Sequence, residues 1–127
     1  RFAEAKEIAI LAVTLGQTWD DVLDGLGARG EAAEAWFLDA LGTRFVDRAS
    51  RLVEERVARD LSREGLGRIG RYRAGFGDVP LELQALFCDF VDAPRIGVQT
   101  TEAMSLWPRK SVTTVVGFRA GEDEDEG

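Results

Sequence analysis

Arginines and glycines gather in one stretch of the chain, residues 64–78, in a way suited to binding an anion. The stretch holds Arg68, Arg71 and Arg73 together with five of the chain's 14 glycines. Guanidinium groups bind carboxylates and phosphates through paired hydrogen bonds, and glycine lets the backbone approach a ligand closely. The stretch has neither the Gly-Lys-Ser/Thr ending of a P-loop nor the glycine spacing of a dinucleotide-binding motif. Taken alone, it predicts a loop that either holds an anion or is merely basic and solvated.

A second polar stretch, residues 101–112, lies between two segments rich in threonine and valine. It contains Glu102, Met104, Arg109 and Lys110. The residue types by themselves predict a connection between two strands with an exposed basic tip.

Composition removes several kinds of chemistry. The chain has no histidine and one cysteine, Cys88, which excludes an internal disulfide framework, the usual zinc, copper and haem ligand sets, and histidine-based catalysis. Cys88 lies between two phenylalanines of an apolar segment and is predicted to be a buried, inert thiol. Any function must therefore use carboxylates, guanidinium groups, hydroxyls and the backbone.

The net charge of −7 comes mostly from the end of the chain. Residues 122–126 supply five acids, and the rest of the chain holds 18 acidic against 16 basic residues. We therefore expect one folded domain over 1–120 and an acidic, disordered tail over 121–127. A folded part that is not basic argues against nucleic acid as a partner. The longest apolar run, Ile8–Val13, is far shorter than the about 20 residues of a membrane span.

The elements that must position these residues fall into separate helical and extended regions. Residues 7–16 are ambiguous between a buried strand and a buried helical turn, and their length and the stop at Gly16 favour a strand. The pattern predicts helices over 18–26 with Thr18 as N-cap, over 31–63, and over 81–91 after Pro80, and strands over 98–101 and 111–118 with a turn at 107–110. Segregated helices and strands predict an α+β fold with a mainly antiparallel sheet.

The long helix over 31–63 carries apolar residues at helical spacing, so we expect one buried face. Its members are Ala33, Trp36, Phe37, Ala40, Leu41, Phe45, Ala49, Leu52, Val53 and Val57. Gly42 is expected to be a weak point or bend, and Trp19 to belong to the core with Trp36 and Phe37. In the helix over 81–91, the expected buried face is Leu83, Leu86, Phe87 and Phe90.

In combination, these stretches resemble the activation (reactivation) domain of cobalamin-dependent methionine synthase. The resemblance covers about residues 6–118. It is carried by Thr14-Leu15-Gly16, Arg71-Tyr72-Arg73-Ala74-Gly75-Phe76-Gly77-Asp78, Pro80-Leu81, Gln84, Leu86-Phe87, Ile96-Gly97-Val98, Thr101-Glu102, Pro108, Lys110-Ser111-Val112 and Gly117.

The resemblance implies an α+β fold around a twisted antiparallel sheet and a binding site for S-adenosylmethionine. In the family, the methyl group of this ligand reaches a cobalamin on a neighbouring domain, and a flavodoxin-type donor supplies an electron, which together restore methylcobalamin. The chain would thus be an accessory domain or subunit of a methyltransferase in methionine biosynthesis, with a corrinoid protein or domain as its partner. With no targeting segment and a single reduced cysteine, a cytoplasmic location is expected.

The resemblance also assigns roles to individual residues. Arg71 matches the arginine that pairs with the ligand's methionyl carboxylate, Ala74 and Gly75 lie where the family's backbone contacts the ligand, and Phe76 stands where the family usually has tyrosine. Glu54, which neighbours Glu55 on the long helix, would face the ligand's positive charge. Glu102 is a further candidate contact.

Two departures leave an alternative open. Family domains are roughly twice this length or more, and part of their ligand site comes from upstream residues. A trimmed or compact version of the domain is therefore one expectation. Phe76 lacks the hydroxyl of tyrosine, and with no histidine the chain has no Asp-x-His-x-x-Gly cobalt ligand, so any cobalamin belongs to a partner. The alternative is a docking or scaffold protein for a corrinoid partner that no longer binds S-adenosylmethionine.

Overall fold

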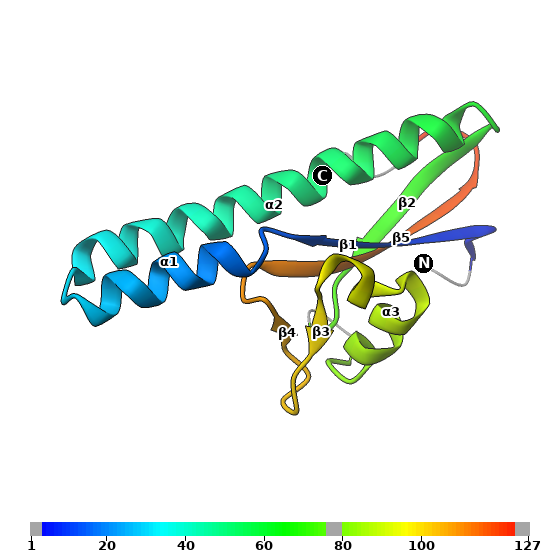
Figure 1. Cartoon of the computed structure of the whole chain (residues 1–127). Coiled ribbons are helices and arrows are strands. Elements are labelled where there is room, and N and C mark those ends of the chain that lie inside the picture. Colours follow the sequence, from blue (N-terminus) through cyan, green and yellow to red (C-terminus); the bar gives the residue numbers. More distant parts are fainter. Residues whose placement is uncertain (1–3, 76–79, 124–127) are drawn as a thin grey trace.

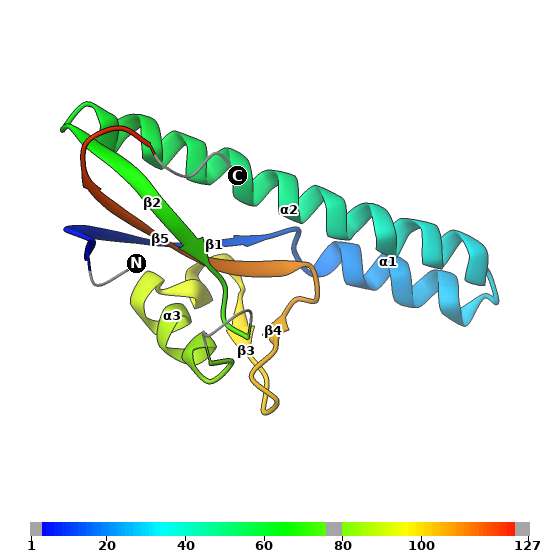
Figure 2. The same cartoon turned by 180° about the vertical axis from the view of Figure 1, so that it is seen from behind.

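The computed structural model describes residues 4–75 and 80–123 and shows an antiparallel sheet with helices on both faces. The sheet has the strand order β1–β5–β2, from β1 (Glu7–Thr14), β5 (Ser111–Ala120) and β2 (Leu66–Tyr72). The long helix α2 (Ala32–Ser62) crosses one face and α3 (Leu83–Val91) lies on the other (Figures 1 and 2). The expectation of an α+β fold with an antiparallel sheet is confirmed.

The central strand β5 builds both halves of the core because its side chains alternate between the two faces. Val116 and Phe118 pack with Ala58 of α2 on one side, and Val115 packs with Phe87 of α3 on the other. The strand β1 pairs along the whole length of β5's first eight residues, with Glu7 opposite Phe118 and Thr14 opposite Ser111. The prediction of a strand for the apolar segment after residue 6 is confirmed.

The predicted loop over 64–78 is wrong for residues 66–72, which form β2. This strand pairs antiparallel with β5, and its register shifts between Arg68 and Gly70, as in a β-bulge. The glycines suggested a loop, but hydrogen bonding to β5 decides the conformation. At Gly67 a β-carbon would overlap the backbone of Glu122, so this glycine is needed for close packing of two chain segments.

The helix α1 (Gln17–Ala28) is longer than predicted and packs beside α2. Gly16 precedes it with no side-chain cap, and Thr18 lies inside the helix, so the predicted N-cap is wrong. The long helix α2 is confirmed almost to the residue. Gly42 is no bend: a β-carbon there would lie 2.5 Å from the indole Nε1 of Trp19, so the glycine makes room for that ring.

The predicted buried face of α2 is wrong. The residues that turn inward are small or polar and follow one another at intervals of four: Gly42, Val46, Ser50, Glu54 and Ala58. The side chains of Trp36, Phe37, Phe45, Leu52 and Val53 are exposed instead. In Figure 1, α1 and the first half of α2 extend beyond the sheet, so Trp36 and Phe37 have no sheet to pack against. Phe45, Leu52 and Val53 fall outside the inward-facing row of α2. Trp19 is half-buried and meets the ring of Phe45 edge to face, with centroids 5.8 Å apart.

The predicted buried face of α3 is partly confirmed. Phe87 and Cys88 are buried, but Leu86 and Phe90 are exposed, so half of the predicted face is wrong. Burial and the neighbouring charge of Asp89 raise the pKa of the Cys88 thiol, which agrees with an inert cysteine. After α3 come a 3-10 turn, Ala93–Ile96, and a two-stranded ribbon of β3 (Gln99–Thr100) and β4 (Leu106–Trp107). Trp107 is therefore in a strand rather than in the predicted turn.

Candidate functional site

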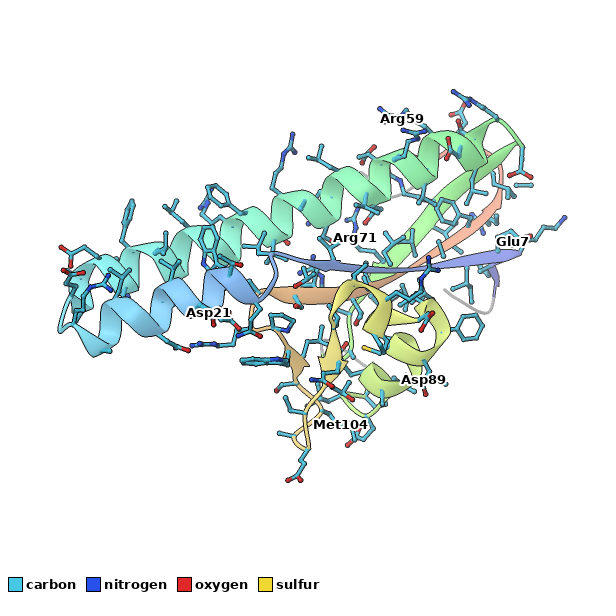
Figure 3. All side chains as sticks on the ribbon, viewed as in Figure 1. Glu7, Asp21, Arg59, Arg71, Asp89 and Met104 are labelled. Atoms are coloured by element: carbon cyan, nitrogen blue, oxygen red, sulfur yellow. The ribbon has the colours of Figure 1, made fainter. Side chains whose placement is uncertain are left out.

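A buried carboxylate under α2 organises the site. Glu54 belongs to the inward-facing row of α2 and is only 2% exposed. Arg71 of β2 donates from Nε to Glu54 Oε1 at 2.7 Å and from Nη2 to Oε2 at 2.5 Å, which is a two-point guanidinium–carboxylate pair. In Figure 3, Arg71 lies between α2 and the sheet. A residue assigned to the ligand's carboxylate thus meets a carboxylate of its own chain.

The same carboxylate binds a second arginine of β2. Arg68 Nη1 donates to Glu54 Oε2 at 2.8 Å and to Glu55 Oε1 at 2.7 Å. Burial alone raises the pKa of Glu54, but hydrogen bonds and positive charge from Arg71 and Arg68 outweigh it and hold the pKa below its ordinary value. Both oxygens of Glu54 accept from arginines, so its charge is directed at them.

Arg68 also ties down the segment that follows β5. Its backbone N–H donates to Asp123 Oδ1 at 2.8 Å, and its Nε and Nη2 donate to Asp123 Oδ2 at 3.0 and 2.8 Å. Burial would lower the pKa of Arg68, but its hydrogen bonds to Glu55, Asp123 and Glu54 raise it, so the group stays charged. Asp123 falls in the expected tail of 121–127. The expectation of disorder beyond it, at 124–127, lies outside the described residues.

From Arg71 the chain runs directly into a groove. Arg73 donates from Nη2 to Asp47 Oδ1 at 3.0 Å, Ala74 is buried, and Gly75 has a φ of +83°, which favours glycine. The groove that follows, here called the strand groove, has a volume of about 390 Å³, within the range of small-molecule sites. It is lined by Arg73, Ala74, Leu81, Gln84, Ser105, Leu106, Arg109, Ser111, Val112 and Thr113.

Hydrogen-bonding groups form part of the strand groove. The buried Thr113 donates its hydroxyl to the side-chain oxygen of the buried Gln84, and Ser111 Oγ donates to the carbonyl of Pro108 at 2.6 Å. Leucines and Val112 supply apolar surface beside them. A ligand with polar ends and a flat apolar part suits such a lining.

The structure brings some of the predicted site residues together and separates others. Arg71, Ala74 and Gly75 lead from the buried Glu54 to the strand groove. Glu102 is exposed in the connection between β3 and β4 and lines neither the strand groove nor the ion-pair cluster. Phe76 lies outside the described residues. Sequence reasoning named Arg68 as a possible anion ligand but missed its pairing with Glu54, and it missed Asp47 as the partner of Arg73. Alternating arginines and a helix carrying acids were the available signal.

The part of the chain that is described contains neither a cluster arranged to hold a metal ion nor a helix that could span a membrane. No group of three or more histidine, cysteine or acidic side chains there is arranged to hold a metal ion. Across residues 4–75 and 80–123, no helix is both long enough and apolar enough to span a bilayer.

Comparison with known proteins identifies the fold. The structure matches the MetH reactivation domain, solved in a crystal with AdoHcy bound, with a TM-score of 0.74 and 23% identity. The match covers 87% of this chain and 38% of that one, so the chain spans well under half the length of its structural neighbour. No family model and no curated protein matches the sequence. The fold is therefore that of the MetH reactivation domain, as the sequence resemblance led us to expect.

Proposed function

We propose that this chain is an S-adenosylmethionine-binding module that serves the reductive re-methylation of a cobalamin held by a partner. The observation that carries the proposal is the shared fold with a domain that binds AdoHcy, the demethylated form of that ligand. It is supported by the strand groove, which opens where the Arg71–Gly75 segment leaves the sheet. The strand groove has the size and mixed lining that an adenosyl amino acid needs.

In this proposal Arg71 supplies positive charge to the methionyl carboxylate, and Glu54 is the positioning residue that holds its guanidinium. Ala74 and Gly75 bring backbone close to the ligand, with Phe76 and Glu102 as further candidate contacts. Gln84 and Thr113 offer polar atoms for the remainder of the ligand. The ligand supplies the methyl group, and the chain's own residues bind and orient it.

The partners follow from the same proposal. A corrinoid protein or domain would accept the methyl group, and a flavodoxin-type donor would supply the electron. The cobalamin would belong to the partner, because the chain has no histidine to serve as a cobalt ligand.

Calorimetric titration of S-adenosylmethionine and AdoHcy tests the proposal. We expect saturable binding by the natural chain and a loss of about 10- to 150-fold in Arg71→Ala, the scale of about 1.5–3 kcal/mol for a lost charged hydrogen-bonding partner. Arg56→Ala is the matched control, because Arg56 is an exposed arginine that pairs, among the described residues, with Asp60. A tryptophan in place of the exposed Ser105 would fill the strand groove and abolish binding without touching the ion pairs. Thermal unfolding of each variant confirms that it folds.

A docking role without ligand binding is the second candidate, and one observation favours it. The arm formed by α1 and the first half of α2 exposes Trp36, Phe37 and Phe45, with Trp36 73% exposed, and such apolar surface is typical of protein interfaces. If the chain has a docking role without ligand binding, calorimetric titration with millimolar S-adenosylmethionine should give no heat of binding. The cobalamin-binding domain of a methionine synthase would then bind the natural chain and bind Trp36→Ala more weakly. Ligand binding through Arg71 would instead favour the first candidate.

A further inference from the structure

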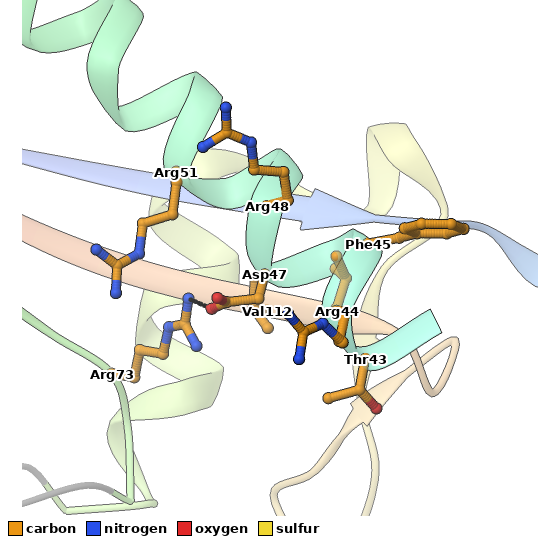
Figure 4. Close-up of a pocket in the computed structure, with 9 residues that line it drawn as sticks. Thr43, Arg44, Phe45, Asp47, Arg48, Arg51, Arg73 and Val112 are labelled. Atoms are coloured by element: carbon orange, nitrogen blue, oxygen red, sulfur yellow. Dashed lines mark hydrogen bonds and ion pairs between the residues drawn. The ribbon is translucent and has the colours of Figure 1, made fainter. Parts of the chain in front are cut away.

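A second groove runs along the flank of α2, and its lining is strongly positive. It has a volume of about 730 Å³ and lies between α2, the segment after β2 and the start of β5. Its lining residues are Thr43, Arg44, Phe45, Val46, Asp47, Arg48, Arg51, Arg73 and Val112. We call it the arginine groove (Figure 4).

The arginines of this groove far outnumber its acids. Asp47 is the sole acidic residue among the lining residues, and it pairs with Arg73 at 3.0 Å. Arg44, Arg48 and Arg51 form no ion pair with any residue in the described ranges, and the Nε of Arg51 is buried there without an acceptor. A buried donor without an acceptor is unfavourable, so the described chain leaves the hydrogen bonding of Arg51 incomplete.

The spacing of these arginines makes the positive charge local. Arg44, Arg48 and Arg51 are four and three residues apart on α2, which places them on one side of the helix, where like charges repel. Arg68 and Arg109, by contrast, pair with acids. In a chain with a net charge of −7, such an uncompensated positive surface is not a general property of the protein.

The side chains also converge. Figure 4 shows the guanidinium groups of Arg44, Arg51 and Arg73 on the side of α2 that carries Asp47 and faces Val112 of β5, whereas Arg48 points away from them. Three planar guanidinium groups around one hollow suit an anion with several oxygens and more than one negative charge. A single carboxylate would satisfy only one of them.

We propose that the arginine groove binds a small molecule bearing phosphate groups, with Arg44, Arg51 and Arg73 as its ligands. The shared chemistry is that of an oligophosphate, whether free or part of a larger compound. Arg73 and Val112 line both grooves, but Arg44 and Arg51 line the arginine groove and not the strand groove. The positive lining of the arginine groove disfavours the positively charged sulfonium of S-adenosylmethionine.

Titration of inorganic triphosphate into the whole chain tests the proposal, at a constant ionic strength of about 0.15 M to screen diffuse attraction. We expect one site per chain, a loss of tenfold or more in Arg51→Ala and in Arg44→Ala, and little change in Arg59→Ala. Arg59 is the matched control because it is exposed on the same helix, forms no described ion pair and does not line the groove. Thermal unfolding of each variant without ligand checks that it folds.

Several results would overturn the proposal. One is an absence of binding at millimolar triphosphate; another is an equal loss in Arg59→Ala, which would mean diffuse attraction to the helix. Citrate binding as tightly as triphosphate would show that the groove recognises negative charge in general rather than phosphate groups. A glutamate-rich peptide binding more tightly than triphosphate would assign the groove to an acidic protein segment instead. S-adenosylmethionine titrated into Arg51→Ala and Arg44→Ala separates the two sites, since its affinity should not depend on either arginine.

Discussion

The same helix, α2, meets two groups of arginines in opposite ways. Near its C-terminal end, Arg68 and Arg71 are enclosed and share the carboxylates of Glu54, Glu55 and Asp123. Arg44 and Arg51, which belong to α2 itself, border an open groove and have no acidic partner in the described residues.

The difference shows that the side of α2 on which an arginine lies decides whether it is paired inside the fold or available to bind a ligand. The enclosed pair meets Glu54 because every fourth residue of α2 faces the sheet, and buried charges persist only when paired and hydrogen-bonded. The groove arginines lie on a side of α2 that the sheet does not cover, so water or a ligand must satisfy them. The first group, Arg68 and Arg71, stabilises the fold, and the second group, Arg44 and Arg51, is available to bind a ligand.

Replacing the shared carboxylate is the strongest way to break the enclosed group. Glu54→Gln leaves Arg68 and Arg71 buried beside an amide, and we expect a loss of about 3–5 kcal/mol in the free energy of unfolding. Urea denaturation at pH 7 measures it. Glu55→Gln is the matched control, because the side chain of Glu55 is 53% exposed and its pair with Arg68 should contribute less than about 1 kcal/mol. Equal losses in the two variants would contradict the buried role of Glu54.

Lowering the pH should affect the enclosed arginine cluster and the arginine groove differently. The pKa values of Glu54 and Asp123 lie below the ordinary 4.5 and 3.8, so both carboxylates stabilise the fold above those values, and this contribution is lost as the pH falls through the lower folded-state pKa values. We expect the free energy of unfolding to decline between pH 5 and acid pH. The decline should be shallower in Glu54→Gln and unchanged in Arg51→Ala. An unchanged slope in Glu54→Gln would show that other acids control the acid response.

Substitutions in the arginine groove should have the smallest effect on the free energy of unfolding. Arg51→Ala and Arg48→Gln remove arginines without ion pairs, so the free energy of unfolding should stay within about 0.5 kcal/mol of the natural chain. Any gain in Arg48→Gln, from relieved repulsion with Arg44, should disappear in 1 M salt. Thermal and urea unfolding at two salt concentrations measure both. A large loss of stability in either variant would mean that the groove arginines are structural, like the enclosed ones.

Local patterns were enough to predict several elements. The apolar run before Gly16 is a strand, and the proline-free segment of helical spacing is α2. Both depend on residues close in sequence, because burial of a short apolar run and a 3.6-residue period are local properties. Resemblance of the motifs, rather than periodicity, placed Arg71, Ala74 and Gly75 near a candidate site.

Two errors came from contacts between distant residues. The glycine-rich segment is β2 because β5, more than 40 residues later, pairs with it. The buried side of α2 was misjudged because Trp36 and Phe37 are on the arm beyond the sheet, where apolar character finds no packing partner. Neither the pairing strand nor the end of the sheet is encoded in the local pattern.

The sequence by itself determined the kinds of chemistry open to this chain: no histidine, no disulfide, and arginines with carboxylates as its main polar groups. It also determined that the helices and strands are segregated in an α+β fold, although β2 was predicted as a loop. Only the tertiary structure decided which arginine meets which acid. Glu54 and Arg71 are 17 residues apart, and they touch because α2 lies across β2 with its small inward residues allowing close approach. Arg51, one turn away, lies outside the inward-facing row of α2 and lines the arginine groove instead.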